Sequence, residues 1–343
     1  MSAFYNLKVK NLKKETQSSV AISFEVIGDL VSVFQYSSGQ YVSLKLTINN
    51  KEVLRDYSIC SSKNEELTIA VKEIPNGYVS SFLNNSINIG DAILVTAPRG
   101  KFVLDTNSSQ ASIGIAAGSG ITPIMSMLKT TLFESSNNFH LIYSNKSPKE
   151  TMFLSELNEL KEKYPDRFFV TLTYTQQKVD NHFFGRITEA NVFSLINISD
   201  LSKNKVYICG PEKMLFEVKS GLEKKNVLEK NIYYELFKSS EENTVNVSEI
   251  GGVEITFTVD DYSTKIKSTK QKTVLDSALD NDIDAPYSCN GGVCGSCIGK
   301  IIKGEVKMMK NTVLTDSELS DGLVLACQAM PVSDIIEIDF DDV

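Results

Sequence analysis

The chain of 343 residues contains 35 basic and 43 acidic side chains, and 42% of its residues are hydrophobic. This length predicts two or three domains with ordinary packed cores. No apolar run reaches the roughly 18 residues of a membrane-spanning helix, and the segment Met1–Asn6 has no signal-peptide core. We therefore expect a cytoplasmic protein without a membrane span.

The net charge of −8 lies entirely in the last quarter of the chain. Residues 1–252 contain 27 acidic and 27 basic side chains, whereas residues 253–343 contain 16 acidic and 8 basic ones. This distribution argues against a basic surface that binds nucleic acid. It favours an acidic module that docks on a partner protein with a basic face. The alternative is an acidic domain whose charge serves only solubility.

Residues 1–105 have the pattern of a small antiparallel β-barrel. Short apolar runs alternate with turn residues such as Gly28-Asp29 and Gly90-Asp91. One helix is expected at Val79–Asn84. The expected strands are Phe4–Val9, Ser19–Val26, Tyr41–Ile48, Leu67–Val71 and Ala92–Thr96.

Residues 106–240 alternate between short apolar runs and helix-like stretches. Such alternation predicts an α/β domain with a parallel sheet and crossover helices. The expected strands are Ile113–Ala117, Phe139–Tyr143, Phe168–Tyr174 and Val206–Cys209. The expected helices are Pro123–Phe133, Thr151–Lys163 and Pro211–Lys224.

A polar, charged stretch, Lys238–Ser248, predicts a linker. Strand patterns resume at Val253–Val259 and Thr264–Lys267, with a hairpin turn at residues 260–261. Thr273 precedes Asp276 by three residues, and this spacing predicts a capping box that opens a short helix ending at Asp280.

Four of the six cysteines lie between residues 289 and 327. Four residues separate Cys289 from Cys294, two separate Cys294 from Cys297, and Cys327 follows after 29 more. This is the spacing of plant-type 2Fe-2S ferredoxins, in which one loop supplies three thiolates and a separate element supplies the fourth. We therefore expect these four thiolates to bind a 2Fe-2S cluster.

Two other metal centres are weaker explanations of the cysteine pattern. Zinc sites favour two matched pairs of cysteines, so a zinc site is the alternative to the cluster. A Rieske centre needs two histidine ligands, and His140 and His182 lie far from this loop in the sequence. Gly291, Gly292 and Gly295 suit a tightly folded loop around a cluster.

The segment Ala285–Cys297 resembles the cluster loop of a ferredoxin with the β-grasp fold. With the motifs below, nearly the whole chain resembles oxygenase reductases of the ferredoxin–NADP reductase superfamily that carry a C-terminal 2Fe-2S ferredoxin domain. The resemblance implies an FAD-binding antiparallel β-barrel at residues 1–105 and an NAD(P)-binding α/β domain at 106–240. A linker at 241–252 and an α+β ferredoxin domain at 253–343 follow.

A motif at Arg55–Ser58 resembles the R-x-Y-S/T flavin motif of this superfamily. The resemblance implies that Arg55 neutralises the flavin pyrophosphate, that Tyr57 packs on the isoalloxazine and that Ser58 hydrogen-bonds near flavin N5. A planar guanidinium suits phosphate, and an aromatic ring offers a stacking surface. Singly, Arg55 could equally be a surface ion pair, and FMN is a minor alternative to FAD.

A second segment, from Val71 to Ser80, precedes a short helix and resembles the family's phosphate-binding element. Backbone N–H groups and a serine hydroxyl bind the phosphate there, as suits a helix N-terminus. A turn at Ala97–Phe102 resembles the one that closes the flavin barrel. The resemblance assigns to flavin binding Arg55, Asp56, Tyr57, Ser58, Val71, Lys72, Gly77, Val79 and Ser80.

Two glycine-containing motifs resemble the nicotinamide site of the same superfamily. The first follows the strand that ends at Ala117, and the second follows the strand that ends at Cys209. Buried packing is the alternative role of Cys209. The resemblance assigns to dinucleotide binding Gly118, Ser119, Gly120, Thr122, Pro123, Cys209, Gly210 and Pro211. The residues expected to approach the reacting rings are Ser58, Cys209, Glu235 and Phe237.

The choice between NADH and NADPH depends on charges near the ribose. Lys146, Lys178 and Arg186 follow the second and third expected strands or lie close to them, and they suit a 2′-phosphate. No acidic residue there suits a ribose diol, which slightly favours NADPH.

The predicted function is an iron–sulfur flavoprotein reductase that passes electrons from NAD(P)H through FAD and a 2Fe-2S cluster to a partner oxygenase. The cofactors supply this chemistry, and the protein positions them. The domain order most resembles reductases of the phenylacetyl-CoA epoxidase type. The alternatives are a ring-hydroxylating oxygenase, a steroid hydroxylase or a hybrid-cluster protein as acceptor. A flavin reductase whose ferredoxin domain only docks and a zinc-stabilised adaptor are further alternatives.

Overall fold

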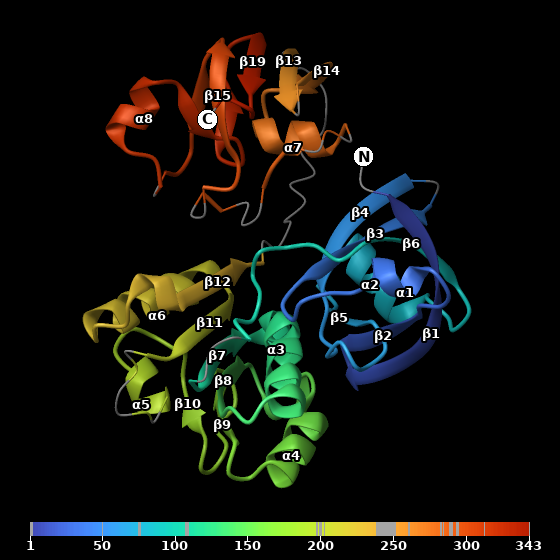
Figure 1. Cartoon of the computed structure of the whole chain (residues 1–343), viewed down its shortest axis with the longest axis vertical. Coiled ribbons are helices and arrows are strands. Elements are labelled where there is room, and N and C mark those ends of the chain that lie inside the picture. Colours follow the sequence, from blue (N-terminus) through green and yellow to red (C-terminus); the bar gives the residue numbers. More distant parts are fainter. Residues whose placement is uncertain are drawn as a thin grey trace. The chain divides into compact units, whose positions relative to one another are not determined.

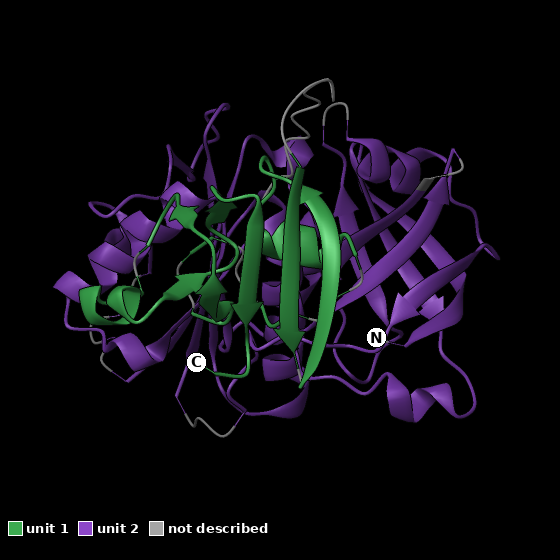
Figure 2. Ribbon diagram, turned by 90° about the horizontal axis from the view of Figure 1, so that it is seen from above, with its two compact units in different colours: residues 1–2, 238–343 green, residues 3–237 purple. Residues whose placement is uncertain are grey.

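The structure is a computed structural model, and its described residues form two compact units (Figure 2). One unit comprises residues 3–237, and the other comprises the described residues after 251. The structure describes residues 3–49, 51–74, 77–106, 110–196, 198, 201, 203–237, 252–259, 261–281, 283, 285–287, 291–292, 295–311 and 313–342.

The first part of the larger unit is the predicted antiparallel barrel. Its strands are β1 (Phe4–Thr16), β2 (Ser19–Glu25), β3 (Tyr41–Ile48), β4 (Lys51–Ser58), β5 (Thr68–Lys72) and β6 (Ala92–Thr96). They pair in the order β4-β3-β6-β1-β2-β5. A bridge between Ile59 and Ile69 joins the two outer strands and closes the sheet. The strand β4, which contains Arg55–Ser58, has too few apolar residues to stand out as a buried run.

Two helices accompany the barrel, α1 (Leu30–Val33) and α2 (Tyr78–Asn85). The predicted helix at Val79–Asn84 corresponds to α2. Val79 and Leu83 lie one turn apart and are both buried against the barrel core. This packing fixes the start of α2 beside the end of β5.

A parallel six-stranded sheet forms the second part of the larger unit. Its order is β10-β9-β8-β7-β11-β12, and each pair runs parallel. The helices α3 and α4 lie on one face of the sheet and α5 and α6 on the other (Figure 1). The strands are β7 (Ser112–Ala117), β8 (Phe139–Asn145), β9 (Phe168–Tyr174), β10 (Phe183–Phe184), β11 (Lys205–Gly210) and β12 (Ile232–Leu236). The helices are α3 (Ile121–Glu134), α4 (Leu154–Lys163), α5 (Val192–Ile196) and α6 (Glu212–Lys224).

The predicted helix starts in this sheet domain differ from the structure by one to three residues, and the largest difference is at α4. The helix expected from Thr151 begins at Leu154 instead. Phe153 adopts a left-handed conformation with φ of 60°, which a helix interior excludes. The Phe153 side chain is buried in the domain core, so packing outweighs the cost of this backbone conformation.

The smaller unit has a mixed five-stranded sheet in the order β14-β13-β19-β15-β17, beside a two-stranded sheet of β16 and β18. Only β13 and β19 pair in parallel, as the α+β prediction allows. Its strands are β13 (Gly252–Val259), β14 (Tyr262–Thr269), β15 (Ile298–Lys303), β16 (Val306–Met308), β17 (Leu323–Leu325), β18 (Ala329–Pro331) and β19 (Ile335–Asp339). Its helices are α7 (Val274–Leu279) and α8 (Asp316–Ser320).

The predicted helix start at Thr273 is confirmed as an N-cap. The Asp276 N–H donates to Thr273 Oγ1 over 3.0 Å. Both bonds of a capping box occur instead at α8, where Thr315 pairs with Glu318. The longer side chain of glutamate reaches back to the N-cap backbone, which an aspartate is too short to do well. No helix within the described ranges is long and apolar enough to cross a membrane.

Candidate functional site

Three of the four residues expected near the reacting rings lie together in the structure. Ser58 ends β4 of the barrel, and its Oγ donates to Glu235 Oε2 over 3.4 Å. Glu235 lies in β12 and is the direct register partner of Cys209 in β11. One hydrogen bond therefore joins the flavin motif to the strands that carry the nicotinamide motif.

The protonation states of Glu235 and Cys209 follow from their surroundings. Burial raises the pKa of Glu235 to about 8, the nearby Asp56 carboxylate adds to this increase, and the Ser58 hydrogen bond opposes it. Burial, with a contribution from Glu235, raises the pKa of Cys209 well above its usual range. At neutral pH the carboxyl and the thiol are thus both mostly protonated. Because Oε2 accepts the Ser58 hydrogen bond, Glu235 can hold or donate a proton at Oε1.

Phe237, the fourth expected residue, follows the end of β12. It is partly buried and packs against the core of the parallel-sheet domain. Tyr57 is also partly buried, but it packs against the barrel core. Burial raises the pKa of the Tyr57 phenol well above its usual range, so this ring stays neutral. Tyr57 directly precedes Ser58, and Phe237 follows Glu235 by two residues, so each domain supplies one aromatic residue close in sequence to the hydrogen-bonded pair.

Alternation along β4 divides the Arg55–Ser58 motif between two faces. Arg55 and Tyr57 share one face, and Asp56 and Ser58 share the other. Ser43 Oγ donates to Asp56 Oδ1, and Nη2 of Arg99 lies 3.9 Å from the same oxygen. The sequence prediction assigns Asp56 to the flavin, whereas the structure places it in contact with these two side chains.

Arg99 is a second guanidinium near the flavin motif that the sequence prediction did not single out. Its Nη2 donates to Ser43 Oγ over 2.7 Å, and its guanidinium lies 5.4 Å from the centre of the Tyr41 ring. The signal in the sequence was its place in the turn Ala97–Phe102. Only the pairing of Tyr41 with Arg99 brings this turn beside β4.

The start of α2 has the geometry of an anion site. Ile74 N–H donates to Ser80 Oγ over 3.0 Å, and Gly77 N–H donates to Ile74 O over 2.8 Å. A Cβ on Gly77 would lie 2.5 Å from Ser80 Oγ, so this tight turn requires glycine. The first-turn N–H groups, including that of Val79, have no partner within the helix. These residues fit a flavin phosphate.

Val71 and Lys72 make other contacts in the structure. The Val71 carbonyl accepts a hydrogen bond from Asn84 Nδ2 over 3.2 Å. Lys72 Nζ lies 3.7 Å from Glu150 Oε2 of the parallel-sheet domain. Burial lowers the pKa of Lys72, and Glu150 opposes that decrease. Lys72 therefore contributes to the contact between the two domains of the larger unit.

The glycine loop Gly118–Gly120 forms one short turn between β7 and α3. Thr122 Oγ1 donates to Ser119 O over 3.1 Å. Tyr143 in β8 donates its hydroxyl to Gly118 O over 3.0 Å, which the sequence prediction missed. Pro123 lies in the first turn of α3, where no intrahelical N–H bond is lost.

The two nicotinamide motifs lie in direct contact. A Cβ on Gly120 would lie 2.3 Å from Cys209 O. A Cβ on Gly210 would lie 2.7 Å from Met214 Cε, and Pro211 is the N-cap of α6. The backbone at Gly120 thus approaches Cys209 too closely for any other residue. The motifs form one backbone surface at the carboxyl edge of the sheet, which fits a dinucleotide.

Two of the four predicted cluster ligands lie in described residues. Cys297 precedes β15 and Cys327 follows β17, and both are buried. Ala326 N–H donates to Cys297 O over 2.9 Å, so the two cysteines lie on adjacent segments. Gln328 Nε2 donates to Cys327 Sγ over 3.6 Å. This pair of buried sulfurs fits a thiolate-bound cluster; Cys289 and Cys294 lie outside the described residues.

Three family models match successive parts of the chain. The oxidoreductase FAD-binding domain matches residues 6–121, and the oxidoreductase NAD-binding domain matches residues 115–220. The 2Fe-2S iron-sulfur cluster binding domain matches residues 257–332. These matches confirm the predicted cofactors, which are FAD, a 2Fe-2S cluster and NAD(P)H.

Relatives cover nearly the full length. One subunit of the 1,2-phenylacetyl-CoA epoxidase of Escherichia coli K12 is 34% identical, over 99% of both chains. The ferredoxin reductase component of 3-ketosteroid-9-alpha-monooxygenase of Mycolicibacterium smegmatis is 33% identical, over 98% of this chain and 97% of the relative. The solved structure of phthalate dioxygenase reductase matches with a TM-score of 0.67 at 23% identity, over 98% of both chains. This last likeness confirms the three-domain fold.

Proposed function

Because the chain belongs to the family of FAD- and NAD(P)H-dependent reductases with a C-terminal 2Fe-2S ferredoxin domain, we propose that it is the reductase component of a phenylacetyl-CoA epoxidase-type oxygenase. It is an NAD(P)H-dependent oxidoreductase of the kind that supplies oxygenases with electrons. When bound, FAD would supply the chemistry that couples two-electron hydride transfer from NAD(P)H to one-electron transfer into the cluster. We assign residues 1–105 to FAD, 106–240 to NAD(P)H and 253–343 to the cluster.

The observation that carries this assignment is the hydrogen bond between Ser58 and Glu235. It joins the flavin motif to the nicotinamide motif within one compact unit. Hydride transfer needs both rings in contact, and residues from both domains meet at this point. Ser58 orients the Glu235 carboxyl by donating to Oε2, and the carboxyl proton is then held by the other oxygen, Oε1. The uncharged side chain of Cys209 is buried beside Glu235.

The remaining assigned residues bind and orient the cofactors. Arg55 neutralises the pyrophosphate of FAD, and the first turn of α2 binds phosphate through Val79 and Ser80. Tyr57 and Phe237 pack on the flavin ring. The cluster is bound by Cys289, Cys294, Cys297 and Cys327.

The partner is inferred from similarity and charge. The epoxidase relative from Escherichia coli matches 99% of this chain at 34% identity, which favours an epoxidase-type acceptor. The steroid monooxygenase reductase is nearly as similar, at 33% identity, so a steroid hydroxylase is the second candidate. The excess of acidic side chains after residue 252 favours an acceptor with a basic docking face.

Absorption and EPR spectra of the purified holoprotein test the proposed cofactor chain. We expect flavin bands with a broad iron–sulfur shoulder extending to about 550 nm, and a rhombic EPR signal after reduction by NAD(P)H. Flavin bands without the EPR signal would leave a flavin reductase whose ferredoxin domain only docks. A colourless, zinc-containing protein would refute the proposal.

Reconstitution with candidate acceptors tests the partner. The reductase is mixed with an epoxidase oxygenase component or with a steroid hydroxylase oxygenase component, and NAD(P)H-dependent product formation is measured. We expect at least tenfold higher turnover with the epoxidase component. Preference for the steroid hydroxylase would refute the epoxidase assignment and leave the reductase function intact.

A further inference from the structure

Three polar side chains of α3 are buried on the face that meets the barrel. Ser126, Lys129 and Thr130 are 0%, 6% and 5% exposed. Their spacing of three and four residues places them on one side of the helix. A buried lysine costs free energy unless a carboxylate compensates its charge. These residues therefore need specific partners.

Each of the three side chains bonds to the barrel. Ser126 Oγ donates to Ser61 O over 2.6 Å, and the hydroxyls of Thr130 and Ser38 lie 2.5 Å apart. Lys129 Nζ donates to Glu65 Oε1 over 3.3 Å. These three bonds fix α3 both along its axis and about its axis relative to the barrel.

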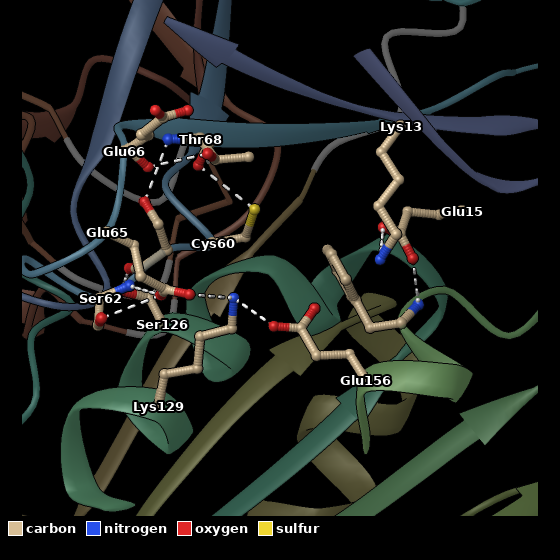
Figure 3. Close-up of polar contacts among 12 residues, drawn as sticks. Lys13, Glu15, Cys60, Ser62, Glu65, Glu66, Thr68, Ser126, Lys129 and Glu156 are labelled. Atoms are coloured by element: carbon tan, nitrogen blue, oxygen red, sulfur yellow. Dashed lines mark hydrogen bonds and ion pairs between the residues drawn. The ribbon is translucent and has the colours of Figure 1, made fainter. Parts of the chain in front are cut away.

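The carboxylate of Glu65 is itself held in place. The backbone N–H and the hydroxyl of Ser62 both donate to Glu65 Oε2, over 2.7 and 2.9 Å. This leaves Oε1 directed at Lys129 (Figure 3). Lys129 Nζ also lies 2.6 Å from Glu156 Oε1 of α4. A single ammonium thus joins α3, α4 and the barrel segment 61–65.

A second contact anchors α4 to the barrel. Glu15 Oε2, from β1, accepts a hydrogen bond over 3.1 Å from the N–H of Phe153, which immediately precedes α4. The Glu15 side chain is only 5% exposed, and its other oxygen lies 3.0 Å from Lys13 Nζ. Because the contact between Glu15 and Phe153 fixes the start of α4, this helix holds Glu156 near Lys129.

The position of Lys129 connects the two halves of the reaction site. The segment 61–65 continues from Tyr57 and Ser58 of β4, and α3 continues from the loop Gly118–Gly120. We propose that Lys129 is a positioning residue for hydride transfer, which sets the separation between the flavin motif and the nicotinamide loop. This inference rests on the assignment of those two motifs under the proposed function.

The expected consequence follows from the geometry of hydride transfer. A displacement of about 1 Å can cost roughly 100-fold in rate. Nucleotide binding depends on α3, β11 and their loops within one domain, so it should change little. Loss of Lys129 should therefore lower the limiting rate of flavin reduction more than the affinity for NAD(P)H.

The test compares Lys129→Met with the wild-type holoprotein in anaerobic stopped-flow reduction by NAD(P)H. We expect the limiting rate to fall at least tenfold, while the nucleotide dissociation constant changes less than threefold. The primary deuterium isotope effect with 4-deuterated nucleotide should stay equal or increase. Reduction of the bound FAD and cluster by dithionite should remain complete, and Lys129→Arg should restore most of the rate.

Lys219→Met is the matched control. Lys219 also lies near two carboxylates, 2.9 Å from Glu229 and 3.7 Å from Glu223, but all three residues belong to the parallel-sheet domain. This variant should reduce its flavin within twofold of the wild-type rate. If Lys129→Met fails to fold, Glu65→Gln replaces it in the test. Lys129 keeps its ion pair with Glu156 in that variant, so we expect a three- to tenfold fall in the limiting rate of flavin reduction.

Two results would overturn the inference. One is a limiting rate of flavin reduction within twofold of wild type in Lys129→Met, or in Glu65→Gln where that variant replaces it. The other is an equal fall in Lys219→Met, which would indicate a general loss of stability. If NADH and NADPH both fail to reduce the wild-type flavin, the proposed function fails, and this inference fails with it.

Discussion

The buried polar side chains of the two compact units differ in the hydrogen-bond partners they reach. In residues 3–237, buried hydroxyl and amino groups connect the barrel to the parallel-sheet domain, as Ser126 does with Ser61 and Thr130 with Ser38. In the described part of the smaller unit, the buried Ser277 bonds to Thr273 O, four residues away, and to Ser268 of β14. These polar bonds align two domains in the first unit and join elements of a single domain in the second.

This difference matches the electron-transfer steps assigned to each unit. Hydride transfer requires two bound molecules to meet in one geometry, so the domains that hold them must be aligned. A 2Fe-2S cluster is held by thiolates of one domain, three of which come from a single loop. Its unit needs a preorganised loop and a surface for a partner. Variants of the two units should thus separate into two kinetic classes.

Cys294→Ser should have the largest effect, and it should impair only electron transfer to the acceptor. A missing thiolate removes the cluster, so transfer to the acceptor should fall at least 1,000-fold, whereas flavin reduction by NAD(P)H should stay within twofold. Stopped-flow absorbance measures the first step, and acceptor turnover measures the second. Cys60→Ser is the matched control, because that buried thiol lies in the barrel. Normal acceptor turnover by Cys294→Ser would contradict the electron order.

Gly120→Ala should impair the other step, flavin reduction by NAD(P)H. The new Cβ would lie 2.3 Å from Cys209 O, so the two nicotinamide motifs must separate. We expect kcat/KM for NAD(P)H to fall on the order of 100-fold, equivalent to about 3 kcal/mol. Reduction of the cluster by dithionite should be unchanged. Gly252→Ala, where the new Cβ would meet nothing closer than Ser268 O at 3.8 Å, is the control for loss of a glycine; an equal fall there would refute the close-approach explanation.

Glu235→Gln should change how stability depends on pH in the larger unit. Because the folded-state pKa of Glu235 is raised to about 8, the folded protein retains a proton that the unfolded chain releases above about pH 4.5. Wild-type stability should therefore fall, relative to the variant, from pH 5 to 8, by up to about 4 kcal/mol. Thermal release of FAD, followed by flavin fluorescence, measures this. A constant difference across that range would contradict the protonated state.

Neutralising acidic side chains of the smaller unit should have the smallest effect. Asp316 and Asp321 are exposed at the two ends of α8. In Asp316→Asn/Asp321→Asn, acceptor reduction should slow two- to tenfold at low ionic strength and match wild type in high salt. The matched control, Asp29→Asn/Asp166→Asn, removes two exposed charges from the larger unit and should have no effect. Equal slowing by both pairs would refute docking through the acidic unit.

Much of the fold was predictable because local patterns agree with the tertiary structure. The apolar runs Tyr41–Ile48 and Ala92–Thr96 became β3 and β6 with identical limits. Prediction was weaker where packing opposes local preference. Phe153 has a left-handed backbone because its side chain is buried and its N–H binds Glu15. The polar strand β4 was recognisable only from its resemblance to a flavin motif.

The cofactors could be inferred from the sequence alone, because each is recognised through a short segment whose residue types and spacing are set by chemistry. Thiolate spacing indicates a 2Fe-2S cluster, and glycines beside a strand end indicate a close approach to a nucleotide. How the motifs combine depends on the tertiary structure. Residues 58 and 235 share a hydrogen bond, and Lys129 meets Glu65 across a domain boundary. Such contacts depend on how one domain packs against the other, which leaves no periodic signal along the chain.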